Sequence, residues 1–194
     1  SLRYCDRLLD GFGLTWTDDA AGVPEHVEGY SNLLWVLLTA GLGALGIELV
    51  TAARALGAVC TALALWWLAD ALRPNSLRSA IVASVAPLLV ASTQPVMIWT
   101  LAGLEGPLVL ALLALGFRGL AHRYGDSQHQ AEYTRAGLML AGLPFAVACL
   151  ARPDGPLWAC MAGTGLAIMS LPQGIGTALH RALFFGLPSL LAVT

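Results

Sequence analysis

Six stretches of this sequence run without a charged residue, and their lengths approach that of a membrane-crossing helix. An α-helix rises about 1.5 Å per residue, so a hydrocarbon core of about 30 Å requires about 20 residues. We predict membrane spans at residues 54–72, 79–98, 104–121, 136–151, 155–171 and 182–194. The predicted fold class is therefore all-α, in a polytopic integral membrane protein.

The composition agrees with this prediction and excludes several classes of function. Hydrophobic residues make up 57% of the chain and charged residues 11%, whereas soluble domains carry about 25% charged residues. The basic residues are all arginine and form no basic patch typical of nucleic-acid binding. The sequence contains no phosphate-binding loop, no hydrolase nucleophile elbow and no zinc-protease helix motif. We expect membrane lipids as partners and no nucleic acid.

The segment Ser31–Leu45 is apolar but short. Its 15 residues would make a helix of about 22 Å, which fits an interfacial helix better than a span. We therefore divide the chain into a periplasmic loop at 1–53, containing short amphipathic and interfacial helices, and a transmembrane helical bundle at 54–194. If Ser31–Leu45 crosses the bilayer instead, every later segment changes sides.

The arginines indicate an orientation, because cytoplasmic loops are enriched in them. The predicted loops at 73–78, 118–135 and 172–181 hold most of the arginines, and we place these loops in the cytoplasm. The loops at 99–105 and 151–154 hold only Arg152. Together with residues 1–53, they are expected on the periplasmic face of a bacterial inner membrane.

Two short polar motifs occupy the periplasmic span ends. They are Gly103-Leu104-Glu105-Gly106-Pro107 and Ala151-Arg152-Pro153-Asp154-Gly155. Each alone fits a turn that ends one helix and starts the next, with an acid favoured at the helix N-terminus. Taken with Glu28, they place ionisable side chains in one compartment at one depth, which indicates a binding site.

Several strings occur in an order that resembles a known superfamily. Arg3-Tyr4 precedes Leu8-Leu9-x-Gly11-x-Gly13-Leu14-x-Trp16. The string Val27-Glu28-Gly29-Tyr30-Ser31-Asn32-Leu33-Leu34-Trp35 follows, and then come Gly103-Leu104-Glu105 and Arg152-Pro153-Asp154-Gly155. This order resembles the GT-C glycosyltransferases that use polyprenyl-phosphate sugars, and is nearest to the mycobacterial terminal arabinofuranosyltransferase-like group. Arg7 and Ala102 depart from its pattern, which usually has Asn and Ser at these positions.

The resemblance implies a GT-C-like helical bundle with a periplasmic first loop. It implies an inverting transferase that moves a sugar from a polyprenyl-phosphate donor to a glycan or lipid acceptor of the cell envelope. Arg3 and Arg152 are expected to contact phosphate, because the arginine fork bonds two oxygens at once. Glu28 and Glu105 are expected to bind hydroxyls or to help hold a divalent metal, which some branches use and the sequence does not establish. The full set of expected substrate-binding residues is Arg3, Tyr4, Glu28, Tyr30, Asn32, Trp35, Glu105, Arg152 and Asp154.

The family's catalytic acid lies just before the Arg-Tyr pair. Here only Ser1 and Leu2 precede Arg3, and Asp6 and Asp10 do not match the position. We therefore expect the general base upstream of Ser1, in a chain truncated at both ends and inactive alone.

Two other functions stay open. A secondary transporter or lipid flippase would place ionisable residues in mid-span, and the predicted spans carry none. A non-catalytic membrane scaffold subunit would use the two polar motifs only as structural turns.

Overall fold

The computed structural model describes residues 1–18, 24–25, 32–72, 74–124 and 134–193, and most of them are helical. The helices are α1 (Leu2–Leu9), α2 (Leu33–Ala44), α3 (Leu49–Ala71), α4 (Leu77–Ala91), α5 (Gln94–Ala102), α6 (Gly106–Tyr124), α7 (Arg135–Ala151), α8 (Gly155–Ser170) and α9 (Ile175–Val193), with a 3₁₀ turn, η1, at Leu171–Gln173. Two strands of two residues each, β1 (Thr17–Asp18) and β2 (Pro24–Glu25), pair antiparallel. The predicted all-α class is confirmed.

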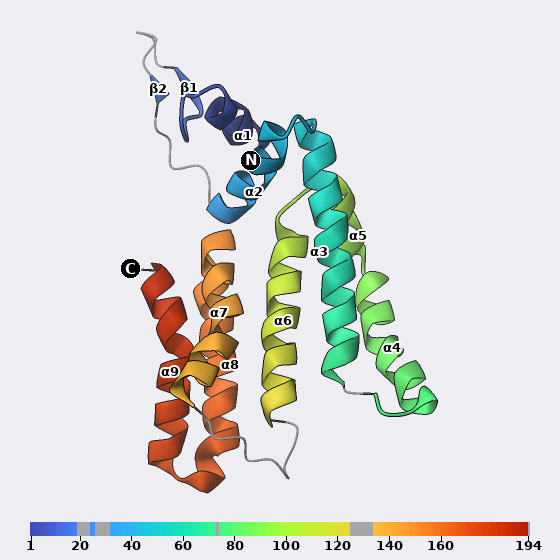
Figure 1. The fold of residues 1–194 in the computed structure, drawn as a ribbon, viewed down its shortest axis with the longest axis vertical. Coiled ribbons are helices and arrows are strands. Elements are labelled where there is room, and N and C mark those ends of the chain that lie inside the picture. Colours follow the sequence, from blue (N-terminus) through green and yellow to red (C-terminus); the bar gives the residue numbers. More distant parts are fainter. Residues whose placement is uncertain (19–23, 26–31, 73, 125–133, 194) are drawn as a thin grey trace.

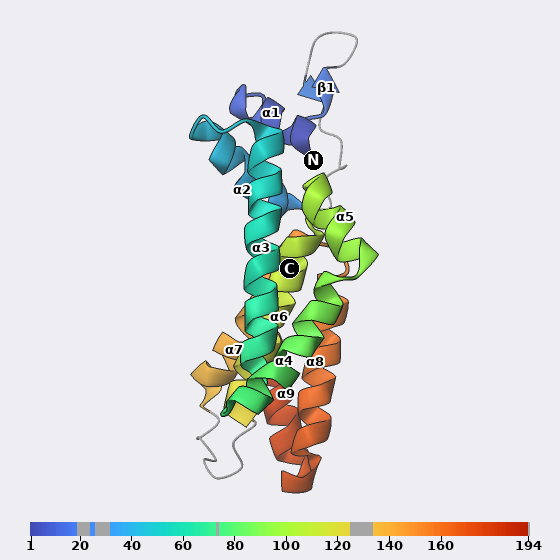
Figure 2. The same cartoon turned by 90° about the vertical axis from the view of Figure 1, so that its right-hand side faces the viewer.

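The long helices run roughly parallel to the longest axis of the molecule (Figures 1 and 2). We call the end that carries α1 and α2 the upper end, and the end where α3 and α6 finish the lower end. α3 and α6 descend from the upper end, α7 rises to it, α8 descends again and α9 returns upward (Figure 1). The turns before α6 and between α7 and α8 therefore both lie at the upper end.

Some of the helices meet the length and apolarity needed to cross a membrane. Among the described residues, α3 and α9 do so, with mean hydropathies of 1.6 and 1.3. α4 and α5 form a third candidate when they are counted as one bent span. Three other apolar segments are too short for this test. They are α2, the part of α6 from Gly106 to His122, and α7. A membrane protein is thus supported, while the six-span count and the orientation stay predictions.

The span predicted at 79–98 is two helices, not one. α4 and α5 meet at an angle of 64° (Figure 2). Pro95 lies in the first turn of α5, where it has no N–H to give the preceding turn and its ring would clash with a continuing helix. Ser92 and Thr93 at the break donate their hydroxyls to the carbonyls of Leu89 and Val90. The proline therefore ends one helix and begins the next.

The loop predicted at 172–181 is also shorter than expected. Gly174, with a φ of 110°, completes the turn after η1, and α9 begins at Ile175. Arg181 therefore lies in a helix, where its buried guanidinium donates to the Ser170 hydroxyl at 3.1 Å. The prediction that Arg181 belongs to a cytoplasmic loop is wrong.

Two apolar clusters hold the bundle together. One joins α3 and α6 to α2 and includes Trp35, Ala64 and Ala114. The other joins α7, α8 and α9 through Phe145 and Phe185, whose rings meet edge to face at 5.3 Å. Large apolar side chains also cover much of the outer surface, a pattern expected for helices that face lipid.

Candidate functional site

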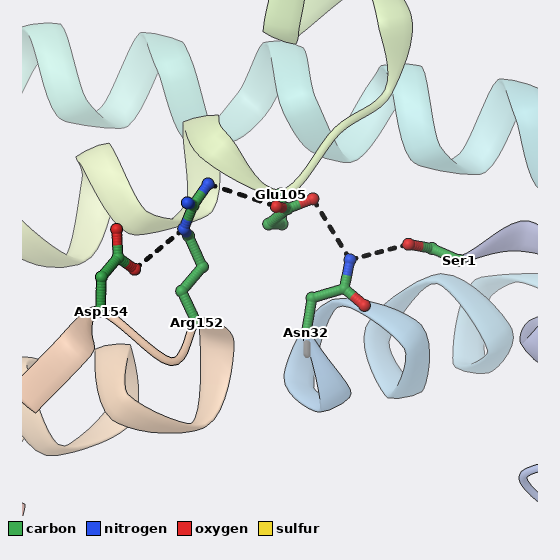
Figure 3. Close-up of polar contacts among 5 residues, drawn as sticks. All are labelled: Ser1, Asn32, Glu105, Arg152 and Asp154. Carbon is green, nitrogen blue, oxygen red and sulfur yellow. Dashed lines mark hydrogen bonds and ion pairs between the residues drawn. The ribbon is translucent and has the colours of Figure 1, made fainter. Parts of the chain in front are cut away.

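Four polar side chains from three distant segments meet at the upper end, around the carboxylate of Glu105 (Figure 3). Its Oε1 lies 3.4 Å from Nη1 of Arg152. Its Oε2 accepts a hydrogen bond of 3.2 Å from Nδ2 of Asn32. Nε of Arg152 is 2.9 Å from Oδ1 of Asp154. We call Asn32, Glu105, Arg152 and Asp154 the upper cluster.

The backbone places Glu105 at the start of α6. Gly103 ends α5 in the left-handed conformation, with a φ of 69°. The carbonyl of Glu105 then accepts from the amides of Leu108 and Val109, so Glu105 is the N-cap residue that immediately precedes α6. This position favours an anion, because the positive end of the helix dipole lies there.

A second tight turn places Arg152 and Asp154. Arg152 is extended, with φ −155° and ψ 149°, because the following Pro153 disfavours a helical conformation. The amide of Gly155 donates back to the Arg152 carbonyl at 3.0 Å. A Cβ at Gly155 would lie 2.4 Å from Cα of Cys149, so the turn requires glycine. The Asp154 side chain does not cap α8 but pairs with Arg152.

Asn32 connects the N-terminal segment to this cluster. It precedes α2, is buried, and donates from Nδ2 to Oγ of Ser1 at 2.7 Å as well as to Glu105. The sequence gives no signal for the contact with Ser1, because a single serine outside any motif carries none.

Charge and exposure determine what the upper cluster can bind. The side chains of Glu105, Arg152 and Asp154 are 19%, 35% and 41% exposed, so the site is half open. One cation faces two carboxylates, which favours ligands with hydroxyl donors over a free anion. Nε and Nη1 of Arg152 are engaged, and the fork retains Nη2 as a further donor.

The geometry of the upper cluster also shows whether its residues could hold a metal ion. The described residues contain no group of three or more His, Cys, Asp or Glu side chains that could hold an ion. The Arg152 guanidinium already occupies the position between the two carboxylates that a cation would take. The residues of the upper cluster therefore do not fit a divalent metal.

The other expected binding residues lie elsewhere. Arg3 donates from Nε to the carbonyl of Trp16 at 2.6 Å and its guanidinium lies over the Trp16 ring. Tyr4 is buried against α2. Glu28 and Tyr30 lie outside the described residues. The roles of these four residues stay predictions.

Trp35 is fully buried beneath the upper cluster. It lies one turn after Asn32 and belongs to the apolar cluster that includes Leu108 and Ala151, the neighbours of the Glu105 and Arg152 turns. Its indole Nε1 has no hydrogen-bond partner among the described residues. In this conformation Trp35 supports the site from below, and a ligand would reach it only after a local rearrangement.

A second ionic cluster lies at the lower end. Asp70, near the end of α3, pairs with Nε of Arg118 on α6. Nε2 of His122, one turn later on α6, lies 3.2 Å from Oδ2 of Asp70. We call these three residues the lower cluster. We predicted Arg118 in the loop at 118–135 and did not predict this cluster, although the spacing of four between Arg118 and His122 is a helical signal.

Comparison with protein-family models, with curated proteins and with solved structures finds no match.

Proposed function

We propose that this chain acts in membrane glycosyl transfer, moving a sugar from a polyprenyl-phosphate donor to a cell-envelope glycan or lipid acceptor at the periplasmic face of a bacterial inner membrane. The observation that carries the proposal is the upper cluster, in which Glu105 lies between Arg152 and Asn32. Ionisable residues in membrane segments typically mark functional sites, and those of the upper cluster gather where apolar helices begin and end.

The geometry supports a division of labour between sugar and phosphate. Glu105 and Asp154 carry carboxylate oxygens that accept hydrogen bonds from sugar hydroxyls. Arg152 lies between them, and its remaining Nη2 donor is available to a phosphate oxygen. The donor would therefore bind with its sugar hydroxyls against the carboxylates, and its single phosphate would face Arg152, the one positive charge of the cluster.

The chemistry of transfer follows from this placement. The acceptor oxygen forms a bond to the anomeric carbon while the bond from that carbon to the phosphate oxygen breaks. The acceptor proton passes to a carboxylate base. Hydrogen-bond donors that stabilise the departing phosphate lower the activation barrier of the transfer, and Arg152 is our candidate for this role.

The apolar helices support a lipid-linked donor. α3 and α9 could cross a bilayer, and the upper cluster lies at the end of α7 and the start of α6 and α8. A polyprenyl chain in the bilayer would then bring its phosphate head group to the depth of Arg152.

The test measures binding of polyprenyl phosphate to the purified chain in detergent and, separately, sugar transfer by the intact protein in membranes. Arg152→Gln should weaken polyprenyl-phosphate binding about 10- to 100-fold, the loss expected for a charge-assisted hydrogen bond. Glu105→Gln should reduce transfer with a smaller effect on binding of the sugar-free lipid. Arg54→Gln is the matched control, because Arg54 is an exposed arginine on α3 outside the cluster.

Lipid binding and sugar transfer together distinguish an enzyme from a protein in which the upper cluster has only a structural role. If transfer survives Glu105→Gln, Arg152→Gln and Asp154→Asn alike, the upper cluster is a structural turn and the proposal fails. Equal losses of lipid binding in Arg54→Gln and Arg152→Gln would likewise contradict a specific phosphate contact.

A further inference from the structure

A large cavity opens between the lower half of α6, the end of α3 and one face of α8. Its volume is about 810 Å³. Apolar side chains line it, and they include Leu72, Phe117, Leu120, Trp158, Met161 and Met169. Gly165 widens the cavity on the α8 side, since a Cβ there would meet no atom within 4 Å.

The residues of the lower cluster do not line this cavity themselves, but each is next in the chain to a residue that does. Ala71 and Ala121 both line it, and they are the chain neighbours of Asp70 and His122. Leu72 also lines a second cavity, of about 460 Å³, which reaches Arg78 at the start of α4. Among the described residues, this edge of the cavity therefore carries the guanidinium groups of Arg118 and Arg78 against the single carboxylate of Asp70.

Arg118 is suited to hold an additional anion. Among the described residues only its Nε is engaged, by Asp70, which leaves the two Nη groups of a fork that matches phosphate. Its side chain is 37% exposed, so a ligand can approach it without unfolding the helix pair.

We propose that this cavity binds an anionic glycerophospholipid, with one acyl chain between α6 and α8 and its phosphate on Arg118. Basic residues at the edge of an apolar groove between membrane helices are the combination that recognises such head groups. The proposal rests on the proposed function only in placing the helices in a bilayer. The site differs from that of the sugar donor, because Arg118 lies 13 residues after Glu105, or about 20 Å along α6.

Trp158 provides a direct probe of the cavity. The full chain would be reconstituted in vesicles with acyl chains brominated on either phosphatidylglycerol or phosphatidylcholine, and bromine quenches nearby indole fluorescence. The difference between wild type and Trp158→Phe isolates the Trp158 signal. Since Trp158 Nε1 has no hydrogen-bond partner among the described residues, the phenylalanine variant loses no such bond. We expect half-maximal quenching at about fivefold less phosphatidylglycerol than phosphatidylcholine. This is the preference for an anionic lipid that one arginine contact would give.

Variants distinguish a head-group contact from a structural role of the ion pair. Arg118→Gln should abolish the fivefold preference, whereas Asp70→Asn should increase it, because it breaks the same pair but removes the competing carboxylate. Gly165→Leu should protect Trp158 from both lipids by filling the cavity. Gly176→Leu is its control, since a Cβ at Gly176 also meets no atom within 4 Å but lies outside this cavity.

Three results would overturn the proposal. Equal quenching by the two lipids in wild type would mean ordinary surface lipid. The absence of quenching by either lipid would mean that protein covers the cavity. A parallel loss of preference in Arg118→Gln and Asp70→Asn would mean that the ion pair acts only on structure. None of these measurements uses sugar transfer, so failure here leaves the proposed function standing, and the reverse also holds.

Discussion

Glu48 shows how a single side chain sets where a long helix begins. Its carboxylate accepts hydrogen bonds from the Thr51 hydroxyl at 2.6 Å and from the amides of Thr51 and Val50 at 2.7 and 3.0 Å. These bonds lower the pKa of Glu48, with the Thr51 hydroxyl as the largest contribution. They satisfy amides that the first turn of a helix leaves without partners, and α3 therefore starts at Leu49.

The lowered pKa of Glu48 predicts how the start of α3 responds to pH. A carboxyl group whose pKa is lower in the folded state than in the unfolded state stabilises the folded state. This stabilisation is complete at pH values above the unfolded-state pKa of about 4.3, and it is lost as the pH falls through the folded-state pKa. In hydrogen exchange, the protection factors of the Val50 and Thr51 amides should therefore fall between about pH 5 and the lower folded pKa. Glu48→Ala should show low protection throughout. Equal protection in both proteins near pH 6 would contradict the capping role.

Residues that act through local backbone rules were predictable from sequence, whereas those that act through packing were not. The Glu105 and Arg152 turns carry Gly and Pro next to charged residues, a local pattern that predicted their position at helix ends. The pairing of Asp70 with Arg118 joins residues 48 positions apart. It depends on how α3 and α6 pack, and no local signal specifies that.

At the scale of elements, close helix packing depends on glycine. Gly142 on α7 faces α9, and a Cβ there would lie 2.0 Å from the carbonyl oxygen of Phe185. Small residues allow such an approach, which membrane helices use because the lipid supplies no hydrophobic force between them. The Phe145 and Phe185 rings fill the space beside this contact.

Gly142→Ala should therefore destabilise the α7–α9 pair. A backbone carbonyl cannot move aside as a flexible side chain does, so we expect a loss of about 1–3 kcal/mol in the free energy of unfolding, despite the higher helix propensity of alanine. Gly165→Ala is the control, because its Cβ enters open space; it should be neutral or stabilise by up to about 1 kcal/mol. Unfolding by denaturing detergent in mixed micelles would compare them. Similar stabilities for both variants would show that α7 and α9 adjust without cost.

The predicted span boundaries were wrong where a particular side chain, rather than the length of the uncharged run, determines where a helix begins or ends. The run at 79–98 is uncharged, yet Pro95 divides it, and the proline itself was the available signal. The start of α9 lies seven residues before the predicted 182, because the helix continues through the buried Arg181. A rule that ends spans at charged residues cannot anticipate a buried arginine that donates to Ser170.

At the scale of the whole molecule, the two ionic clusters lie at opposite ends of α6. The upper cluster precedes Gly106, and the lower cluster uses Arg118 and His122 near the other end of the helix. The helices between them are apolar on their outer faces. The two ends therefore act as two polar boundaries of an apolar slab, and the predicted orientation assigns the upper one to the periplasm.

Cysteine labelling in intact bacteria tests this orientation, in a full-length protein with the native cysteines replaced. Asn75→Cys and Gln173→Cys lie at exposed positions of the lower end, and Leu104→Cys is exposed at the upper end. Leu104 is a better probe than Gly103, whose φ of 69° would strain a cysteine. A membrane-impermeant maleimide should label position 104 alone, and permeabilised cells should add positions 75 and 173. The opposite pattern would mean that α2 crosses the bilayer, since one additional crossing reverses every later segment and moves the upper cluster to the cytoplasm.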